Sequence, residues 1–134
     1  KDLACAYKLN AAFYEAQGVA GLKALQKTVA YIGYRCPDIP RILDAKRADI
    51  GNTNNGHITS IFEWMGFDAV TLNVYPGKEA LKPFLDRADK VSIFWCRSSN
   101  PGSGEFQDLL VSPPPPLGEG RERVQSFAMI ERGA

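Results

Sequence analysis

Two carboxylates flank an amino group within six residues of this chain, in the segment Asp44-Ala45-Lys46-Arg47-Ala48-Asp49. The segment continues a strand-like run, and because side chains alternate along a strand, Asp44 and Lys46 are expected on the same face. Asp49 falls just past the strand, in a turn rich in glycine and asparagine. Such an acid–base–acid row suits a catalytic or binding site, and the same spacing also fits a solvated row of charges on an edge strand.

The elements around this row alternate between strand-like and helix-like patterns. The predicted strands are residues 3–8, 41–46, 69–74 and 91–96, and the predicted helices are residues 11–16, 20–34, 54–65 and 79–87. Strands separated by helices need crossover connections, which make a parallel sheet. We therefore expect an α/β fold, a truncated (β/α)8 TIM barrel of about four βα units, since a whole barrel needs roughly 250 residues. Active sites of such barrels lie at the carboxyl ends of the strands, where the charged row falls.

The composition is that of an ordinary globular domain, with 45% hydrophobic and 23% charged residues and a formal net charge of +1. This charge gives no general attraction to nucleic acid or to an anionic membrane, and no apolar run approaches the ~18–20 residues of a membrane span. Three cysteines without a C-x-x-C pair and a single histidine make a poor metal set. We expect a reduced, cytoplasmic protein without metal, in which Cys5 and Cys96 pack as small apolar residues in strands.

The sequence changes character after residue 111. The segment Ser-Pro-Pro-Pro-Pro-Leu-Gly-Glu-Gly-Arg-Glu-Arg has no apolar periodicity, and four consecutive prolines exclude a helix or a central strand. We expect residues 1–111 to form the partial barrel and residues 112–134 to be a low-complexity tail outside the fold. Two interpretations of the tail stay open, a polyproline linker or foreign sequence that replaces the rest of the barrel.

The charged row resembles the D-x-K-x-x-D-I-x-x-T signature of orotidine 5'-phosphate decarboxylases, matched here by Asp44, Lys46, Asp49, Ile50 and Thr53. Three further segments are similar, in the right order, to that family's second strand, its fourth strand and the loop after its fifth strand: residues 5–15, 68–75 and 96–102. The resemblance covers about residues 1–110 and is closest to the bacterial branch with an Arg-Ser/Thr-Ser-Asn-Pro-Gly loop. It implies a half barrel without the family's first strand and its last three.

Removing carbon dioxide from an unsaturated ring carbon leaves a carbanion. Either an electron-sink cofactor or a preorganised cation that also delivers a proton stabilises such a carbanion. The sequence has no nucleotide-cofactor or phosphate-loop motif, and the resemblance implies the second solution, with neither cofactor nor metal. Lys46 would stabilise and then protonate the carbanion, held charged by nearby carboxylates. By the same resemblance Asp44 lies beside the departing carboxylate, and Lys8 and Asp49 complete an alternating Lys-Asp-Lys-Asp array.

The resemblance also implies a partner and residues that bind substrate. Asp49, Ile50 and Thr53 belong to the part of the motif that reaches into the partner subunit's site, so a homodimer with shared active sites is expected. Ser99 resembles the residue that hydrogen-bonds the pyrimidine of orotidine 5'-phosphate. Asn10, near a strand end, is a further binding candidate.

Three positions depart from the family's pattern, and each concerns the backbone. Leu9 and Val74 stand where relatives usually have proline, and Ala48 stands where they usually have glycine. Arg47 points to the opposite face of the strand from the charged row, so we expect it to form a salt bridge on the outer side of the barrel.

Together these features predict a fragment of an orotidine 5'-phosphate decarboxylase, a carbon–carbon lyase that converts orotidine monophosphate to UMP in pyrimidine nucleotide biosynthesis. The resembling segments do not include the late loops that grip the phosphate in this family, and binding energy from a remote phosphate helps to drive such reactions. A non-catalytic barrel remnant is therefore one alternative. A sister decarboxylase that acts on a sugar phosphate with a magnesium ion is another, against which the Ser-Asn-Pro-Gly loop argues. A phosphate-binding barrel module without chemistry is a third.

Overall fold

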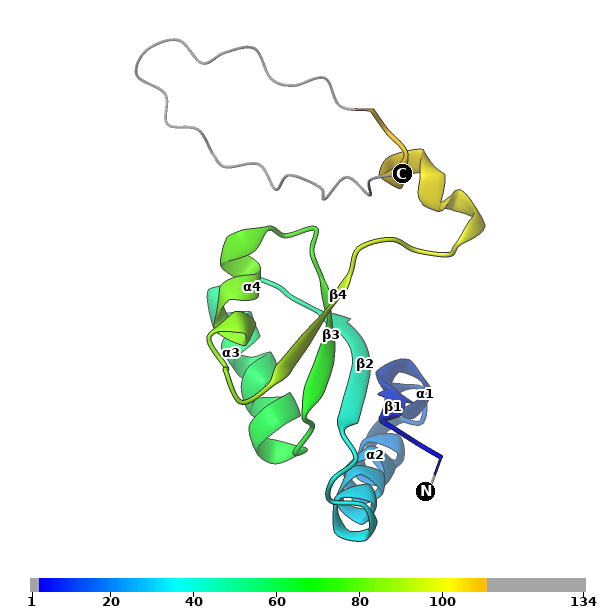
Figure 1. Cartoon of the computed structure of the whole chain (residues 1–134), viewed down its shortest axis with the longest axis vertical. Coiled ribbons are helices and arrows are strands. Elements are labelled where there is room, and N and C mark those ends of the chain that lie inside the picture. Colours follow the sequence, from blue (N-terminus) through cyan, green and yellow to red (C-terminus); the bar gives the residue numbers. More distant parts are fainter. Residues whose placement is uncertain (1–2, 111–134) are drawn as a thin grey trace. The chain divides into compact units, whose positions relative to one another are not determined.

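The computed structural model describes residues 3–110, which divide into two units at Ser98 and Ser99 (Figure 1). The first unit contains, in order, β1 (Tyr7–Asn10), α1 (Ala11–Glu15), α2 (Gly18–Arg35), β2 (Arg41–Arg47), α3 (Gly51–Ile58), the π-helical turn η1 (Thr59–Trp64), β3 (Ala69–Asn73), α4 (Lys78–Leu85) and β4 (Val91–Trp95). The second unit contains the 3-10 turn η2 (Pro101–Ser103) and the short helix α5 (Gly104–Gln107).

The four strands form one parallel sheet in the order β1-β2-β3-β4. Helices connect each strand to the next, and α3 and α4 lie side by side next to the sheet (Figure 1). Neighbouring parallel strands in chain order, joined by helices, are the repeating unit of a (β/α)8 barrel. The predicted α/β fold, with a truncated barrel of four strands, is confirmed.

The two faces of the sheet differ in chemistry. Leu9, Leu43, Val70 and Leu72 point to the helices and are between 0% and 7% exposed. The residues between them in the strands point to the other face, which carries Lys8, Asp44 and Thr71. The helix-facing side is thus the core, and the opposite side is free to carry polar chemistry.

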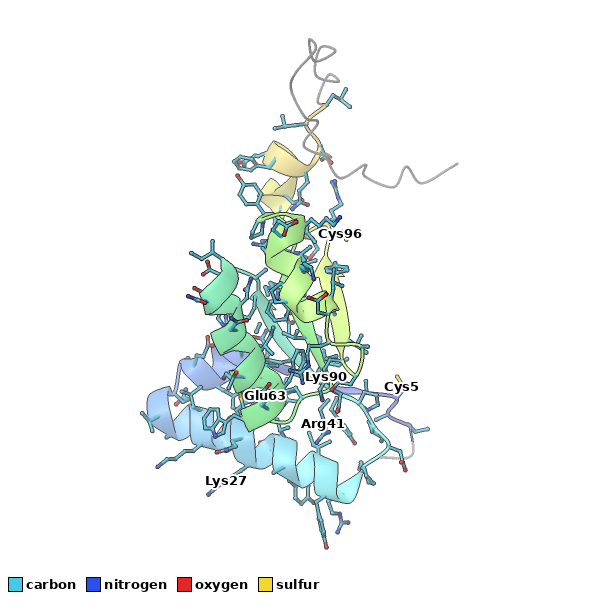
Figure 2. All side chains as sticks on the ribbon, turned by 90° about the vertical axis from the view of Figure 1, so that its left-hand side faces the viewer. Cys5, Lys27, Arg41, Glu63, Lys90 and Cys96 are labelled. Carbon is cyan, nitrogen blue, oxygen red and sulfur yellow. The ribbon has the colours of Figure 1, made fainter. Side chains whose placement is uncertain are left out.

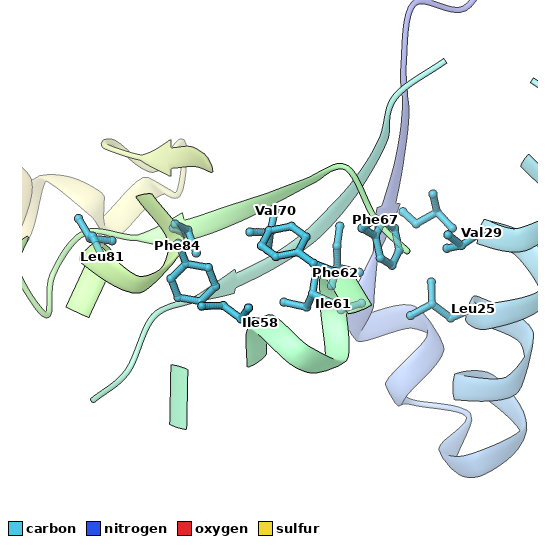
Figure 3. Packing of buried hydrophobic residues seen from close by; sticks show 13 residues of the cluster. Leu25, Val29, Ile58, Ile61, Phe62, Phe67, Val70, Leu81 and Phe84 are labelled. Atoms are coloured by element: carbon cyan, nitrogen blue, oxygen red, sulfur yellow. The ribbon is translucent and has the colours of Figure 1, made fainter. Parts of the chain in front are cut away.

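The core fills the space between the sheet and its helices. Figure 3 shows Leu25 and Val29 of α2 next to Phe67 at one end, and Ile58 next to Phe84 of α4 at the other. Leu25 and Val29 belong to the apolar stripe that the spacing of residues 20–34 predicts, and both are almost completely buried. Because each contributing helix buries one such stripe, burial of apolar surface ties all three connections to the sheet.

Two elements begin three or more residues from their predicted starts. The first strand is Tyr7–Asn10 and not residues 3–8, and Leu3 is fully exposed. The helix predicted over residues 54–65 begins earlier, at Gly51, because the Asn54 amide already donates to the Ile50 carbonyl. It then widens into η1 before Gly66, which has a positive φ of 77° and ends the helix as predicted.

The cysteines lie at different places from those predicted. Cys5 precedes β1 and Cys96 follows β4, and both are exposed, so the expectation that they pack in strands was wrong. All three cysteines are free thiols. Figure 2 shows Cys96 toward one end of the sheet and Arg41 and Lys90 at the other, where Arg41 Nε donates to Asp68 Oδ2 at 2.8 Å. This ion pair fastens β2 to the start of β3 at the end of the sheet remote from the charged row.

The strand β2 leaves regular pairing at the charged row. Leu43 pairs with Val70, and the next paired residue of β2 is Arg47, opposite Leu72, so the intervening residues form a bulge. Lys46 and Ala48 have positive φ angles of 48° and 135°. L-residues rarely adopt such angles, and glycine adopts them without steric cost. The backbone is therefore strained at Lys46 and Ala48.

We predict that Ala48→Gly stabilises the protein by about 1 kcal/mol, because release of backbone strain of about 1–3 kcal/mol outweighs the added flexibility of the unfolded chain. The measurement is the free energy of unfolding from urea denaturation. Ala45→Gly is the matched control: Ala45 packs against the same core without a positive φ, so this change should cost about 0.5–1 kcal/mol. Equal losses of unfolding free energy in the two variants would contradict the assignment of backbone strain to Ala48.

Candidate active site

Three charged side chains meet on the polar face of the sheet. Lys8 Nζ donates to Asp44 Oδ2 at 2.6 Å, and Lys46 Nζ donates to Asp44 Oδ1 at 2.8 Å. The Asp44 side chain is 10% exposed, whereas those of Lys8 and Lys46 are 54% and 43% exposed. One buried carboxylate therefore holds two ammonium groups that remain open to solvent on their other sides. The predicted alignment of Asp44 with Lys46 agrees with this geometry.

These hydrogen bonds determine the charge state of the carboxylate. The bonds from Lys46 and then from Lys8 lower the pKa of Asp44 to about 2, against the opposing effect of desolvation. Thr71 adds a further hydrogen bond in the same direction. Asp44 is therefore an anion throughout the neutral range, and its charge keeps a positive partner on each of its two oxygens.

The hydroxyl of Thr71 fills the gap that the bulge opens in the sheet. Its Oγ1 accepts from the backbone amides of Ala45 and Lys46, both at 3.0 Å, and donates to Asp44 Oδ1 at 3.0 Å. A hydroxyl has one donor and two acceptor positions, and all three are used here. Thr71 thus replaces the missing backbone partners of β2 and fixes the segment that presents Asp44 and Lys46.

Lys46 also contacts the end of β4. Its Nζ lies 5.7 Å from the centroid of the Trp95 ring, within the range of a cation–π interaction. The ammonium therefore has a carboxylate and an aromatic ring among its neighbours.

The loop after β2 carries Asp49 and is held by a buried amide. Asn54 is completely buried, and its Oδ1 accepts from the Asp49 amide at 2.7 Å. Its Nδ2 donates to the Asp49 carbonyl and, at 2.8 Å, to the carbonyl of Ala80 in α4. The carboxylate of Asp49 accepts from the Ile50 amide at 2.6 Å. Asn54 therefore fastens this loop to α4, and Asp49 is engaged with its own backbone rather than with the Lys8–Asp44–Lys46 array.

The remaining predicted residues of this unit lie around the array or outside it. Asn10, opposite Asp44 in the sheet, caps α1, with Oδ1 accepting from the Ala12 amide at 3.0 Å. Ile50 is 76% exposed, and Thr53 is also exposed, in the first turn of α3. Arg47 forms the ion pair expected of it, with Nη2 2.6 Å from Glu15 Oε1.

Ser99 belongs to the second unit, where it is exposed just before η2. The Asn-Pro-Gly segment after Ser99 forms a turn, in which Pro101 begins η2 and the Ser103 amide donates to the Asn100 carbonyl at 3.0 Å. The predicted tail, residues 112–134, lies outside the described residues. Among residues 3–110 no helix is long and apolar enough to cross a membrane, and no group of three His, Cys, Asp or Glu side chains is arranged for a metal ion.

Three residues of the site were missed by reasoning from sequence: Thr71, Asn54 and Trp95. Thr71 carries a weak signal, because it is the polar residue inside an otherwise apolar strand. Asn54 and Trp95 carry none, since a helical asparagine and a strand-end aromatic are common features of ordinary surfaces and cores. Their roles depend on contacts with α4 and β2, which lie 26 and 49 residues away along the chain.

The fold and the site define a (β/α)-barrel protein whose strand ends carry a lysine–carboxylate–lysine array. A family model described as orotidine 5'-phosphate decarboxylase / HUMPS family matches residues 1–117, and the chain belongs to this family. The match passes the boundary predicted after residue 111. Orotidine 5'-phosphate decarboxylase of Herpetosiphon aurantiacus is 50% identical over 116 residues, which are 87% of this chain and 42% of that protein. The enzyme of the same name from Roseiflexus castenholzii is also 50% identical, over 87% of this chain and 41% of its own length.

A solved structure gives the same picture. The OMP decarboxylase of Leishmania donovani superposes with a TM-score of 0.74 and 40% sequence identity, over 79% of this chain and 41% of that one. The chain thus spans about two fifths of the length of the relatives it matches. This portion contains four barrel strands, and each of them contributes a residue to the site.

We predict that acid removes the contribution of Asp44 to stability. Its pKa of about 2 in the folded state lies below the ordinary value of about 3.9, so the contribution is complete above about pH 5 and is lost as the pH falls toward about 2. The difference in free energy of unfolding between the wild type and Asp44→Asn should shrink by about 2 kcal/mol over this range. Urea melts at a series of pH values measure it. A difference independent of pH would contradict the assigned ion pairs.

We predict that Thr71→Val destabilises the protein by about 1–3 kcal/mol, because the bulge amides of Ala45 and Lys46 lose their acceptor. Valine has nearly the same shape as threonine, so packing changes little. Thr71→Ser keeps the hydroxyl and should retain most of the stability despite the loss of a methyl group. If serine were as damaging as valine, packing rather than hydrogen bonding would explain the effect.

Proposed function

We propose that this chain is part of an orotidine 5'-phosphate decarboxylase, a lyase that converts orotidine monophosphate to UMP in pyrimidine nucleotide biosynthesis. The observation that carries the proposal is the ammonium of Lys46, which a buried Asp44 that is ionised at neutral pH holds at the carboxyl end of the sheet. Membership of the family supports it. An array of fixed charges is the machinery that a decarboxylation without an electron-sink cofactor requires.

The proposed step breaks the bond between the pyrimidine ring carbon and its carboxylate. Carbon dioxide leaves, the electron pair stays on the ring carbon, and Lys46 donates a proton to that carbon. The amine then regains a proton from water. Asp44 orients the ammonium and lies beside the departing carboxylate, while Lys8 neutralises the second oxygen of Asp44. Because the charges are in place before substrate binds, little reorganisation is needed when charge develops on carbon.

The proposal includes a second subunit. Asp49, Ile50 and Thr53 would complete the site of a partner copy, with Ser99 hydrogen-bonding the pyrimidine and Asn10 near the substrate. The exposure of Ile50 and Thr53 next to a loop that Asn54 holds in place supports this arrangement, because an apolar side chain that is 76% exposed is available for an interface. We further propose that the enzyme works in the cytoplasm.

The second candidate is a barrel fragment without catalysis. It is favoured by the exposure of apolar side chains on β4. In residues 3–110, β4 is an edge strand of the sheet, and the unpaired backbone groups of an edge strand favour association or aggregation.

We predict that the purified chain lowers the ultraviolet absorbance of orotidine 5'-phosphate as UMP forms, and that Lys46→Ala reduces the rate at least ~1000-fold, since the proton donor is lost. Asp44→Asn should reduce the rate to a similar degree, because the members of the array depend on one another.

Lys82→Ala is the matched control for this assay. Lys82 is also ion-paired with an aspartate, at 2.6 Å from Asp86, but it lies on α4 and is exposed. The Lys82→Ala substitution should leave the rate unchanged. A folded sample, verified by a cooperative circular dichroism melt and a discrete peak in size-exclusion chromatography, that shows no turnover would overturn the proposed activity in favour of the fragment without catalysis.

A further inference from the structure

Among residues 3–110, the aromatic ring that contacts the ammonium of Lys46 is the indole of Trp95. The distance from Nζ to the ring centroid is 5.7 Å. An aromatic ring attracts a cation through the negative potential of its face, and tryptophan does so most strongly. Trp95 is 37% exposed at the carboxyl end of β4, so its ring is at the open end of the sheet, where the array also lies.

The contact bridges two strands that are not neighbours. Trp95 pairs with Asn73, and Asn73 lies on the same face of β3 as Thr71, whose hydroxyl binds Asp44. The strands β2 and β4 are separated by β3, which places their backbones about 9–10 Å apart. Only long side chains reach across such a distance, and lysine and tryptophan are both long. The side chain of Trp95 therefore lies over the polar face, toward the array.

We propose that Trp95 is a positioning residue for Lys46: the indole face holds the ammonium in the orientation in which it also binds Asp44. The ring supplies attraction without a competing hydrogen-bond acceptor, so the protons of the ammonium stay available to Asp44 and to the reacting carbon. It also excludes water from the part of the ammonium that it covers. The catalytic consequence rests on the proposed function, whereas the contact itself does not.

Phe94 provides a matched control within the same strand. It is the neighbouring aromatic residue, it is 39% exposed compared with 37% for Trp95, and it points to the opposite face of the sheet. Substitution of either residue by leucine removes an aromatic ring from the same exposed strand. Only the change at Trp95 removes a ring that contacts the array.

The first measurement tests the contact without substrate. The chain has two tryptophans, and Trp64→Phe leaves Trp95 as the only one. A neighbouring ammonium quenches indole fluorescence, so Lys46→Met in this background should raise the emission of Trp95, whereas Lys82→Met should not. An unchanged emission in the Lys46 variant would overturn the proposal.

The second measurement is a double-mutant cycle on unfolding, with Lys46→Met, Trp95→Leu and the double variant. Direct contact predicts a coupling of about two- to fivefold in the unfolding equilibrium constant, the size of an exposed cation–π interaction. The same cycle with Phe94→Leu should give no coupling. Coupling of equal size in both cycles would mean that the strand responds as a whole and would refute a specific role for the indole.

Kinetics then test the positioning role. Trp95→Leu should lower kcat about two- to fivefold at unchanged KM, with Trp95→Phe intermediate and Phe94→Leu unchanged. An equal loss of rate in Phe94→Leu, or no recovery in Trp95→Phe, would assign Trp95 to packing alone. Absence of turnover in every variant, the wild type included, would count against the proposed function, and the fluorescence and the cycle would still decide the contact.

Discussion

A single buried carboxylate organises the functional end of this sheet. Asp44 accepts an ammonium on each oxygen and a hydroxyl on one of them, and its low pKa follows from these bonds. The dependence is mutual, because a buried charge that loses its partner is costly. Neither lysine is buried, and their shared carboxylate keeps the two positive groups close together.

Backbone geometry and chemistry are coupled at the same place. The bulge in β2 brings Lys46 to a positive φ and leaves two amides without strand partners. One hydroxyl from the neighbouring strand satisfies both amides and also binds the carboxylate, so Thr71 links the irregular backbone to the charged array. Strain stored at a functional position persists only where the surroundings hold it in place, and this hydroxyl is the local means of doing so.

The signature motif divides into two parts with different environments. Its first part, Asp44 and Lys46, belongs to the chain's own sheet and is fixed by contacts to β1, β3 and β4. Its second part, from Asp49 to Thr53, leaves the sheet, and Asn54 fastens it to α4. A site shared between two subunits would require one part that is fixed within its own sheet and a second part that is exposed to the partner. The separation follows from the end of β2, after which side chains no longer alternate across a sheet.

The sequence by itself determined the parallel α/β fold, the position of the charged row at a strand end, and the pairing of Asp44 with Lys46, because periodicity and alternation are local properties of the chain. It also indicated the outward salt bridge of Arg47. Tertiary structure alone decided that Thr71 fills the bulge, that Asn54 anchors the Asp49 loop and that Trp95 reaches Lys46 across β3. It also decided the π-helical turn and the exposure of Cys5 and Cys96. The reason is physical: the contacts of Thr71, Asn54 and Trp95 depend on which atoms of distant segments come within a few ångströms, and no local pattern of residues encodes that distance.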